Sequence, residues 1–259
     1  MLLKIGEAYF NADAESVIDV SIPVQFSAPQ LQAFGAPSAT AQAYRAGEFV
    51  GDVRQGGSCN CASLHFTPHC NGTHTESVGH LTADAWPVRP LARGLYLAQL
   101  ITVTPIANNS IANNNDAIID RTLLKTALQT TFACNALIVR TLPNASDKLT
   151  RNYDQQTPAY FTPDALAWLA EIGIEHLLVD LPSVDRMHDG GQLLAHRAFW
   201  GLPLGSHNLY AAQRPLATIT ELIYVPDHVL DGRYLLNLNI APFDSDAASS
   251  RPLLYPLQQ

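Results

Sequence analysis

The sequence has no apolar run long enough to cross a membrane, and its first residues do not resemble a secretory signal. The opening stretch MLLKIGEAYFNADAESVIDV is interrupted by Glu7 and Asp13 before an apolar core of signal-peptide length has formed. A membrane-spanning helix needs about 20 consecutive apolar residues, and no such run is present. We therefore predict a protein of the cytoplasm with no membrane partner.

Basic residues are also scarce, and they form no cluster. Lys and Arg total 15 against 23 Asp and Glu, which gives a formal net charge of −8. A nucleic-acid backbone would be repelled on balance, so nucleic-acid binding is not expected. Four cysteines in 259 residues do not make a disulfide scaffold, and three of them, Cys59, Cys61 and Cys70, lie close together. This cysteine usage indicates a reducing compartment.

Strand and helix patterns alternate along the chain. Residues 135–142 (NALIVRTL) and 175–182 (EHLLVDLP) are short and apolar, which is typical of buried strands. Between them, Thr162 and Pro163 mark the start of a helix and Gly173 marks its end. With 47% hydrophobic residues the chain can fill a substantial core. These patterns predict an α/β fold.

No linker or internal repeat divides the chain, and we predict a single domain over residues 1–259. Residues 16–26 have the composition of an early strand that ends near a proline. Residues 27–57 are rich in Ala, Gly, Pro, Ser and Gln without a sustained period, which is typical of an irregular surface excursion. The remaining expected elements are strands at 63–69 and 94–106, helices at 120–130 and 190–201, and two connected strands at 216–225 and 233–243.

Residues 66–82 (FTPHCNGTHTESVGHLT) gather ligand-type side chains around an Asn-Gly turn dipeptide. If the chain extends after this turn, His74 and Glu76 point to the same side, because alternate residues of an extended chain share a face. Imidazole, carboxylate and thiolate all bind zinc, and three protein ligands leave one coordination position for water, as in catalytic sites. Cys70, His74 and Glu76 therefore predict a catalytic metal site.

The chemistry expected of such a site is hydrolysis of an amide, ester or lactam. A divalent metal lowers the pKa of bound water to about 7 and polarises a carbonyl oxygen. His80 could take and return protons, because imidazole titrates in the working range. Two alternatives remain: a hydrogen-bonded polar turn without metal, and a closed zinc site of Cys59, Cys61, His65 and Cys70, for which the spacing of the first two is short.

The same residues resemble a motif of the metal-dependent cyclase and kynurenine-formamidase family, which includes isatin hydrolase. The family motif is His-x-Gly-Thr-His-x-Asp-x-Pro-x-His, and this chain reads Cys-Asn-Gly-Thr-His-Thr-Glu-Ser-Val-Gly-His from Cys70 to His80. The segments VIDVSIPV and LLVDLPSVD also resemble family segments. His196 and Glu221 fall where the family places a helix histidine and a strand glutamate, so the resemblance spans most of the chain.

The resemblance implies a single α/β domain of the swivelling β/β/α type with a mixed central sheet, assembled as a homodimer or homotetramer. By the same resemblance, His74 and Glu76 are metal ligands, with Glu76 able to bridge two ions, and His80 is the acid/base. His196 and Glu221 complete a second metal position where one is present. The implied reaction is cleavage of the C–N bond of a formamide or cyclic amide by metal-activated water, on a small substrate that can be aromatic.

Three positions depart from the family motif: Cys70, Glu76 and Val78 stand where it has His, Asp and Pro. Cysteine is a softer ligand, so we predict a divalent metal, zinc in preference to manganese, as one or two ions. His69 could instead supply the missing imidazole, although adjacent residues of an extended chain point to opposite faces; of the two, Cys70 is favoured. The departures also leave open a catalytically inactive relative that binds a small ligand.

Other residues have a structural interpretation. Asp180, Ser183 and Asp185 are expected to cap the next turn or helix through local hydrogen bonds. The apolar segment LLYPL near the C-terminus is expected to pair at an interface of the homo-oligomer. Four large aromatic residues could line a substrate pocket, although such residues more often belong to the core; they are Phe66, Trp86, Phe199 and Trp200.

Overall fold

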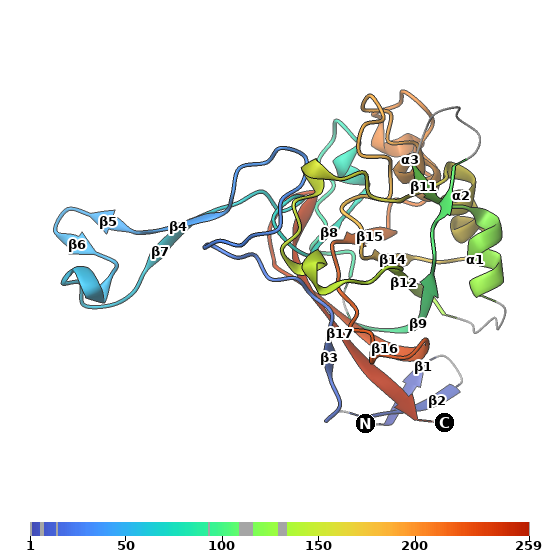
Figure 1. Cartoon of the computed structure of the whole chain (residues 1–259), viewed down its shortest axis with the longest axis horizontal. Helices are drawn as coiled ribbons and strands as arrows, with labels where there is room; N and C mark the ends of the chain where they lie inside the picture. Colours follow the sequence, from blue (N-terminus) through green and yellow to red (C-terminus); the bar gives the residue numbers. More distant parts are fainter. Residues whose placement is uncertain are drawn as a thin grey trace.

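The centre of the molecule is a closed β-sheet (Figure 1), seen in a computed structural model that describes residues 2–5, 8–13, 15–92, 94–108, 116–128 and 134–258. Seven strands follow one another around the sheet, and pairing of β17 with β8 closes it. In order of pairing they are β17 (Ala247–Gln258), β16 (Gly232–Ile240), β9 (Leu95–Val103), β12 (Ala136–Thr141), β14 (His176–Val179), β15 (Thr218–Glu221) and β8 (His74–Glu76).

The sheet is mixed. Strands β9, β12, β14 and β15 run parallel, whereas β8, β16 and β17 pair antiparallel with their neighbours. Parallel strands are usually buried on both faces and therefore need nearly continuous apolar sequence. β12 (ALIVRT) and β14 (HLLV) have this character, and all of their residues are buried. The predicted α/β class with a mixed central sheet is confirmed.

Three helices lie together on one side of the sheet (Figure 1). α2 (Pro163–Glu171) begins after Thr162 and ends before Gly173, whose φ of 88° is left-handed, as the sequence predicts. Its buried residues Leu166 and Leu169 belong to the same apolar core as β12 and β14. Burying these side chains stabilises the fold by roughly 1.5–3 kcal/mol each. The other two helices are α1 (Arg121–Ala127) and α3 (Leu194–Trp200).

Helix α3 is shorter than the predicted helix at 190–201. Gly190, Gly191 and Leu193 all have positive φ, so the chain cannot be helical before Leu194. The prediction was wrong at this end, because the apolar periodicity of 193–200 does not reveal the backbone conformation of the residues that precede it. Within α3 the side chain of His196 is buried.

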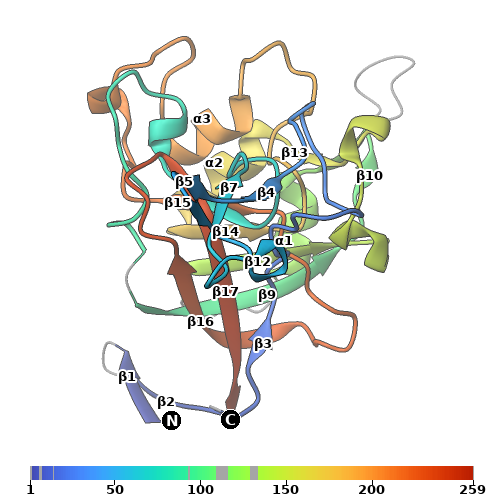
Figure 2. The same ribbon diagram turned by 90° about the vertical axis from the view of Figure 1, so that its left-hand side faces the viewer.

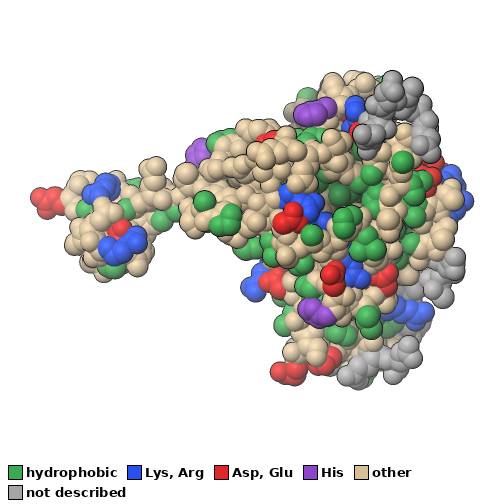
Figure 3. All heavy atoms as spheres, in the orientation of Figure 1, with side chains coloured by type: hydrophobic (Ala, Val, Ile, Leu, Met, Phe, Trp, Pro, Cys, Tyr) green, Lys and Arg blue, Asp and Glu red, His purple; other side chains and the backbone are tan. Residues whose placement is uncertain are grey.

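Residues 40–65, most of which were expected to be irregular, form an arm that projects from the body (Figures 1 and 3). The view along the arm places it in front of the sheet (Figure 2). The strands of the arm pair only with each other and are largely exposed, so the first three show no alternating apolar pattern by which sequence could reveal them, whereas the last overlaps the strand expected at 63–69. They are β4 (Thr40–Ala43), β5 (Arg45–Ala46), β6 (Phe49–Val50) and β7 (Ala62–His65).

One other strand prediction needs correction. The early strand expected at 16–26 is reduced to β3 (Ile18–Asp19), which pairs with β17, and a single bridge between Ser21 and Ile223. The two connected strands expected at 216–225 and 233–243 are present as β15 and β16. They occupy separate places in the sheet, because β15 lies between β14 and β8 while β16 lies between β9 and β17.

The remaining elements are short. Within the ranges described above, no helix is both long and apolar enough to cross a membrane. The short strands and single-turn helices are β1 (Leu2–Ile5), β2 (Ala8–Ala12), β10 (Ile106–Ala107), β11 (Ala117–Ile119), β13 (Tyr160–Phe161), η1 (Val53–Gln55), η2 (Val78–His80), η3 (Ser146–Leu149), η4 (Tyr153–Gln155) and η5 (Leu209–Ala211).

Candidate metal centre

The histidine-rich segment lies at the seam where the sheet closes. Strand β8 pairs with β15 along one edge and with β17 along the other, and His74 lies opposite Glu221 of β15. Thr75 points away from the cluster and its hydroxyl lies 2.8 Å from that of Thr220. Its neighbours His74 and Glu76 therefore share the other face, which is the arrangement expected of an extended chain.

A close-packed turn sets the direction in which β8 leaves. A Cβ atom on Gly72 would lie 2.9 Å from the carbonyl oxygen of Ile22, so a larger residue does not fit without a backbone shift. Thr73 Oγ1 accepts a hydrogen bond from the Ile22 amide at 2.6 Å and donates to the carbonyl of Leu222. The turn is thereby fixed to the segments on both sides of it.

Glu76 is the buried carboxylate at the centre of the cluster. Its Oε1 lies 2.8 Å from Nε2 of His196, and its Oε2 lies 3.1 Å from Nδ1 of His69. On the far side of the His196 ring, Nδ1 lies 2.5 Å from Oδ2 of Asp185. An ionised carboxylate has no proton to donate and acts only as a hydrogen-bond acceptor. Glu76 and Asp185, one on each side of the His196 ring, therefore fix its orientation.

His74 has an orphaned ring nitrogen. Its Nδ1 lies 3.1 Å from the carbonyl oxygen of Gly72, and because a carbonyl can only accept, Nδ1 carries the proton. Its Nε2 is fully buried, has no hydrogen-bond partner among the described residues, and lies 3.5 Å from Oε2 of Glu221. A lone pair and a carboxylate oxygen that face each other in a buried site repel unless a proton or a metal ion lies between them. The geometry therefore fits a metal ion.

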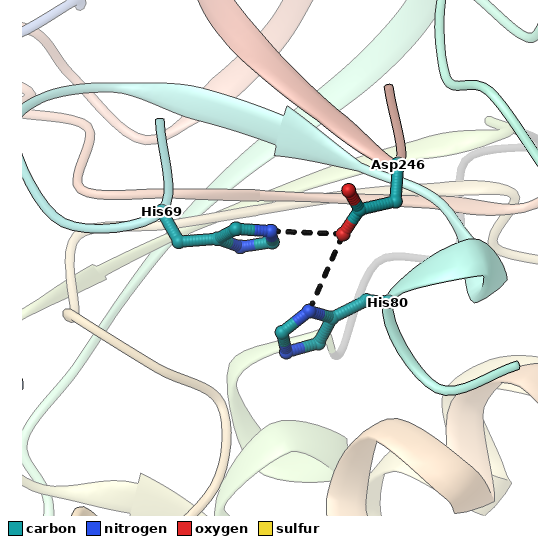
Figure 4. Close-up of side chains that lie close together, drawn as sticks. All are labelled: His69, His80 and Asp246. Carbon is teal, nitrogen blue, oxygen red and sulfur yellow. Dashed lines mark hydrogen bonds and ion pairs between the residues drawn. The ribbon is translucent and has the colours of Figure 1, made fainter. Parts of the chain in front are cut away.

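Asp246, immediately before β17, completes the cluster on its more accessible side (Figure 4). Its Oδ2 lies 3.0 Å from Nε2 of His69 and 3.5 Å from Nδ1 of His80. The two imidazole rings lie close together, with centroids 4.3 Å apart. His80 comes from the single-turn helix η2, which Ser77 caps by accepting a hydrogen bond from the Gly79 amide.

The ligand-type side chains form three overlapping groups. In the part of the chain that the structure describes, three sets of histidine and carboxylate side chains bring ligand atoms within 4.8 Å of one another. Because they share members, one or two ions could be accommodated. The sets are His69, His74 and Glu76; Glu76, His80 and His196; and His69, His80 and Asp246.

A cavity of about 400 Å³ opens onto these groups. His69, Glu76 and His80 contribute to its wall, and Phe34 and Leu193 add apolar surface. A cavity that combines a few polar groups with apolar walls is typical of a small-molecule site.

The six residues predicted for the site are unequally placed. His74, Glu76, His80 and His196 come together as ligand groups, and Glu221 Oε1 lies 3.5 Å from His196 Nε2. The sixth, Cys70, is buried in the wall of the same cavity but belongs to none of the three sets. Burial, with added repulsion from the charges of Glu221 and Asp154, raises the pKa of its thiol to about 11.

His69 reaches the cluster because the chain is not extended there. The amides of Cys70 and Asn71 both donate to the carbonyl of Thr67, at 3.0 and 3.2 Å, so residues 67–71 form a turn. The rule that adjacent side chains point to opposite faces applies to extended backbone only. In this turn both His69 and Cys70 face the cavity.

Burial and charge act in opposite directions on the pKa values of the cluster. Burial raises the pKa of Glu76, but the charges of His80 and His196 outweigh it and hold that pKa well below its usual range. Burial lowers the pKa of His196, yet Glu76 and Asp185 raise it well above its usual value. For His69, hydrogen bonds to Asp246 and Glu76 overcome burial and raise the pKa to about 10. A cation bound by these atoms would displace protons from the imidazoles.

The predicted capping residues behave differently from one another. Ser183 Oγ accepts from the Asp185 amide, which is a local cap as expected. Asp185 accepts from the amides of Ala195 and His196 at the start of α3, and it also holds the His196 ring, a role that the sequence did not suggest. The prediction was wrong for Asp180, which forms a buried ion pair with Lys148 at 2.8 Å.

The aromatic residues considered for the pocket do not line it. Phe199 and Trp200 are fully buried in the core, and Trp86 donates its indole N–H to the carbonyl of Pro215. Phe34 lines the cavity in their place. A structural zinc site with Cys59 and Cys61 is not supported, because both are exposed on the arm while Cys70 is buried in the wall of the cavity.

Comparison with known proteins places the chain in a family. The family model described as "Putative cyclase" matches residues 18–186, which is more than half of the chain. The chain belongs to this cyclase family. His196, Glu221 and Asp246 lie beyond the matched range, so the family match does not cover them.

The similar proteins have low sequence identity to this chain, but the similarity covers most of its length. The chain is 27% identical over 207 residues to a kynurenine formamidase of Bacillus mycoides (strain KBAB4), covering 78% of this chain and 82% of the relative. Isatin hydrolase A from Ralstonia solanacearum has the same fold, with a TM-score of 0.63, 15% identity, and coverage of 94% and 92%. A structure titled as a predicted metal-dependent hydrolase from Bacillus stearothermophilus gives a TM-score of 0.59, 16% identity, and coverage of 93% and 98%.

Proposed function

We propose that this cyclase-family protein is a metal-dependent hydrolase that cleaves the C–N bond of a formamide or cyclic amide, with a single catalytic domain over residues 1–259. The observation that carries the proposal is the buried Nε2 of His74, which has no hydrogen-bond partner in the described chain and faces Glu221 at 3.5 Å. The names of the relatives support the reaction class, since they include a kynurenine formamidase and an isatin hydrolase.

The proposed ligands are His74, Glu76, His196 and Glu221, with one further ligand from the turn before β8. His69 is the better candidate for that position, because its Nδ1 lies 3.1 Å from Glu76 Oε2. Cys70 remains a predicted ligand on motif position alone. Imidazole and carboxylate ligands suit both zinc and manganese, so the preference for zinc rests on Cys70 and stays a prediction, as does the number of ions, one or two.

The residues of the cluster have separate tasks in hydrolysis. A bound divalent cation would lower the pKa of a water molecule toward neutrality and polarise the amide carbonyl. His80 would accept the proton of the attacking water at Nε2 while its Nδ1 is held by Asp246. It would then return that proton to the departing nitrogen, which leaves as an amine while the carbonyl carbon becomes a carboxylic acid.

The cavity supports a small substrate with an apolar portion. Its volume of about 400 Å³ and the side chains of Phe34, Met187 and Leu193 leave room for one aromatic ring beside the ligand groups. An N-formyl aromatic amine or a cyclic amide fused to an aromatic ring would satisfy both the cavity and the names of the relatives.

The homo-oligomer and the cytoplasmic location stay predictions. The segment LLYPL, however, does not support the homo-oligomer. The LLYPL segment lies in β17, which pairs with β16 on one edge and with β2, β3 and β8 on the other, so it is not free to pair between subunits. The arm at 40–65 has exposed apolar side chains, Tyr44 and Leu64, and is the better candidate for an interface. Light scattering measures the oligomer directly.

The proposal is tested by screening substrates on protein reconstituted with zinc or manganese. N-formyl aromatic amines and aromatic cyclic amides should be hydrolysed. Simple carboxylic esters of similar size show whether the enzyme prefers the C–N bond of an amide to the C–O bond of an ester. Stoichiometric metal with no turnover of either amide class would instead identify the inactive, ligand-binding relative.

A further inference from the structure

Asp246 lies outside the histidine-rich segment, yet its side chain is held at the centre of a hydrogen-bonded arrangement (Figure 4). Its Oδ2 faces both His69 Nε2, at 3.0 Å, and His80 Nδ1, at 3.5 Å. Its other oxygen, Oδ1, accepts from the hydroxyl of Ser245 at 3.0 Å. Both oxygens therefore have defined partners, although the side chain is 34% exposed.

The backbone at Asp246 is tied to the segment that bears His80. The Asp246 carbonyl accepts from the Ser77 amide at 2.9 Å, and pairing of β17 with β8 places the next residue, Ala247, opposite Glu76. Ser77 in turn caps η2, the helical turn that ends with His80. The separation between the carboxylate and the His80 ring is thus tied to backbone hydrogen bonding between these two segments.

The contacts of Asp246 select one tautomer in each of two imidazoles. An ionised carboxylate only accepts, so His80 presents its proton at Nδ1 and leaves Nε2 free to take a proton. For the same reason His69 donates from Nε2, which leaves its Nδ1 directed at Glu76 Oε2, 3.1 Å away. Metal-binding histidines typically donate their second ring N–H to a carboxylate in this way.

We propose that Asp246 is a positioning residue that holds His69 in the orientation of a metal ligand and His80 in the orientation of a proton acceptor. This inference rests on the hydrolase function proposed above. One carboxylate thereby serves both metal binding and proton transfer, and it does so from the residue just before β17, outside the family-matched range of 18–186. The contact with Asp246 also explains how His69 can serve as a metal ligand, although the motif position itself is occupied by the next residue, Cys70.

The test compares Asp246→Asn, Asp246→Glu and, as a matched control, Asp244→Asn. Asp244 is two residues away in sequence, and its side chain is 75% exposed and pairs only with Arg89 in the described chain. Zinc affinity is measured by competition with a chelating indicator, kcat and KM are measured at saturating zinc, and the ring nitrogens of the histidines are observed by ¹⁵N NMR in the zinc-loaded protein. Thermal unfolding reports whether each variant is folded.

For Asp246→Asn we expect zinc affinity and kcat each to fall by roughly 10- to 100-fold, the usual effect of removing a carboxylate partner of a metal-binding histidine. KM should change by less than about 3-fold, since Asp246 does not touch the substrate in this account. The ¹⁵N signals should show that the His80 proton is no longer confined to Nδ1. Asp246→Glu should recover part of both losses, and Asp244→Asn should behave as wild type.

Three results would overturn the inference. The first is a folded Asp246→Asn protein with wild-type zinc affinity, kcat and ring-nitrogen signals. The second is a variant that loses only thermal stability, which would make Asp246 structural. The third is complete loss of stoichiometric zinc, which would make it a direct ligand. If the wild-type protein hydrolyses no amide, the proposed function fails, but the zinc affinities and ¹⁵N signals still decide the role of Asp246.

Discussion

The two ends of strands β14 and β15 each bury a histidine beside a cavity, but the surroundings of the two histidines are opposite. At the amino-terminal end, His176 Nδ1 lies 2.9 Å from Thr218 Oγ1, and the His176 ring packs against Tyr96 at a tilt, with ring centroids 4.1 Å apart. At the carboxyl-terminal end, His196 lies between Asp185 and Glu76. Burial lowers the pKa of His176 to about 4, whereas the carboxylates raise the pKa of His196 well above its usual value.

Cavity size does not distinguish the two ends. The cavity beside His176 has a volume of about 520 Å³, against about 400 Å³ beside His196. The cationic side chain near His176 is Arg214, and its guanidinium already donates hydrogen bonds to the carbonyls of Phe199 and Ile174. What marks the candidate site is therefore the set of buried carboxylates facing imidazoles, which is where a divalent cation would be stabilised.

The largest effect should come from removing the central carboxylate charge. Glu76→Gln keeps the shape of the side chain but removes a proposed ligand, so stoichiometric metal should be lost and activity should fall by more than roughly 10³-fold. Elemental analysis and kcat/KM measure the two effects. Glu175→Gln, at the exposed position just before β14, is the control and should retain both. A Glu76→Gln protein with full metal content would remove Glu76 from the proposed ligands.

The next effect concerns His80 as the proton acceptor. His80→Gln should retain the metal but lower turnover by roughly 10²–10⁴-fold, the usual contribution of a positioned acid/base. His65→Gln on the exposed arm is the matched control. Loss of metal from His80→Gln would reassign His80 as a ligand, and retention of both metal and activity would show that it has neither role.

A smaller effect is expected when the support of His196 is changed. Asp185→Asn replaces the carboxylate that faces His196 Nδ1 with a neutral amide, which can accept or donate there, so the proton of His196 is no longer held on Nδ1 by a charged acceptor. We expect metal affinity to fall by roughly 10- to 100-fold, measured by titration with a competing chelator. Unchanged affinity in a folded variant would mean that Asp185 serves only to cap α3.

The smallest effect is a pH dependence of stability at the opposite end. A folded-state pKa of about 4 for His176 lies below the ordinary value of 6.5, so the unfolded chain binds the extra proton and stability is lost as the pH falls below about 6.5. Between pH 8 and pH 5 this group should cost about 2 kcal/mol. Urea unfolding of wild type and His176→Gln at the two pH values measures it, with the exposed His188→Gln as control. Equal pH dependence in all three proteins would contradict the assignment.

Local signals predicted local structure well. Thr162, Pro163 and Gly173 mark the ends of α2 correctly because the signals that start and stop a helix are local, although Thr162 Oγ1 donates to Asp164 and makes no capping hydrogen bond to the helix amides. The apolar strands β12 and β14 were predicted for a similar reason, since their burial on both faces leaves a continuous apolar run. The first three strands of the arm are largely exposed, and so leave no such pattern.

Contacts between distant segments limited the prediction of the site. His74 and Glu76 could be paired from the alternation of an extended chain, but the same rule misjudged His69 because residues 67–71 form a turn. Asp246 carries no local signal at all, since its partners His69 and His80 are brought to it by the closure of the sheet. His196 and Glu221 were predicted only through the family resemblance.

The central claim is that amide hydrolysis depends on a divalent ion held by the cluster around Glu76. The most direct test is to strip the protein with a chelator, measure hydrolysis of an N-formyl aromatic amine, and add zinc or manganese back in measured steps. We predict that the stripped protein is inactive and that activity returns in proportion to bound metal, reaching a plateau at one or two ions per chain. Full hydrolytic activity in protein shown by elemental analysis to contain no stoichiometric metal would contradict the account.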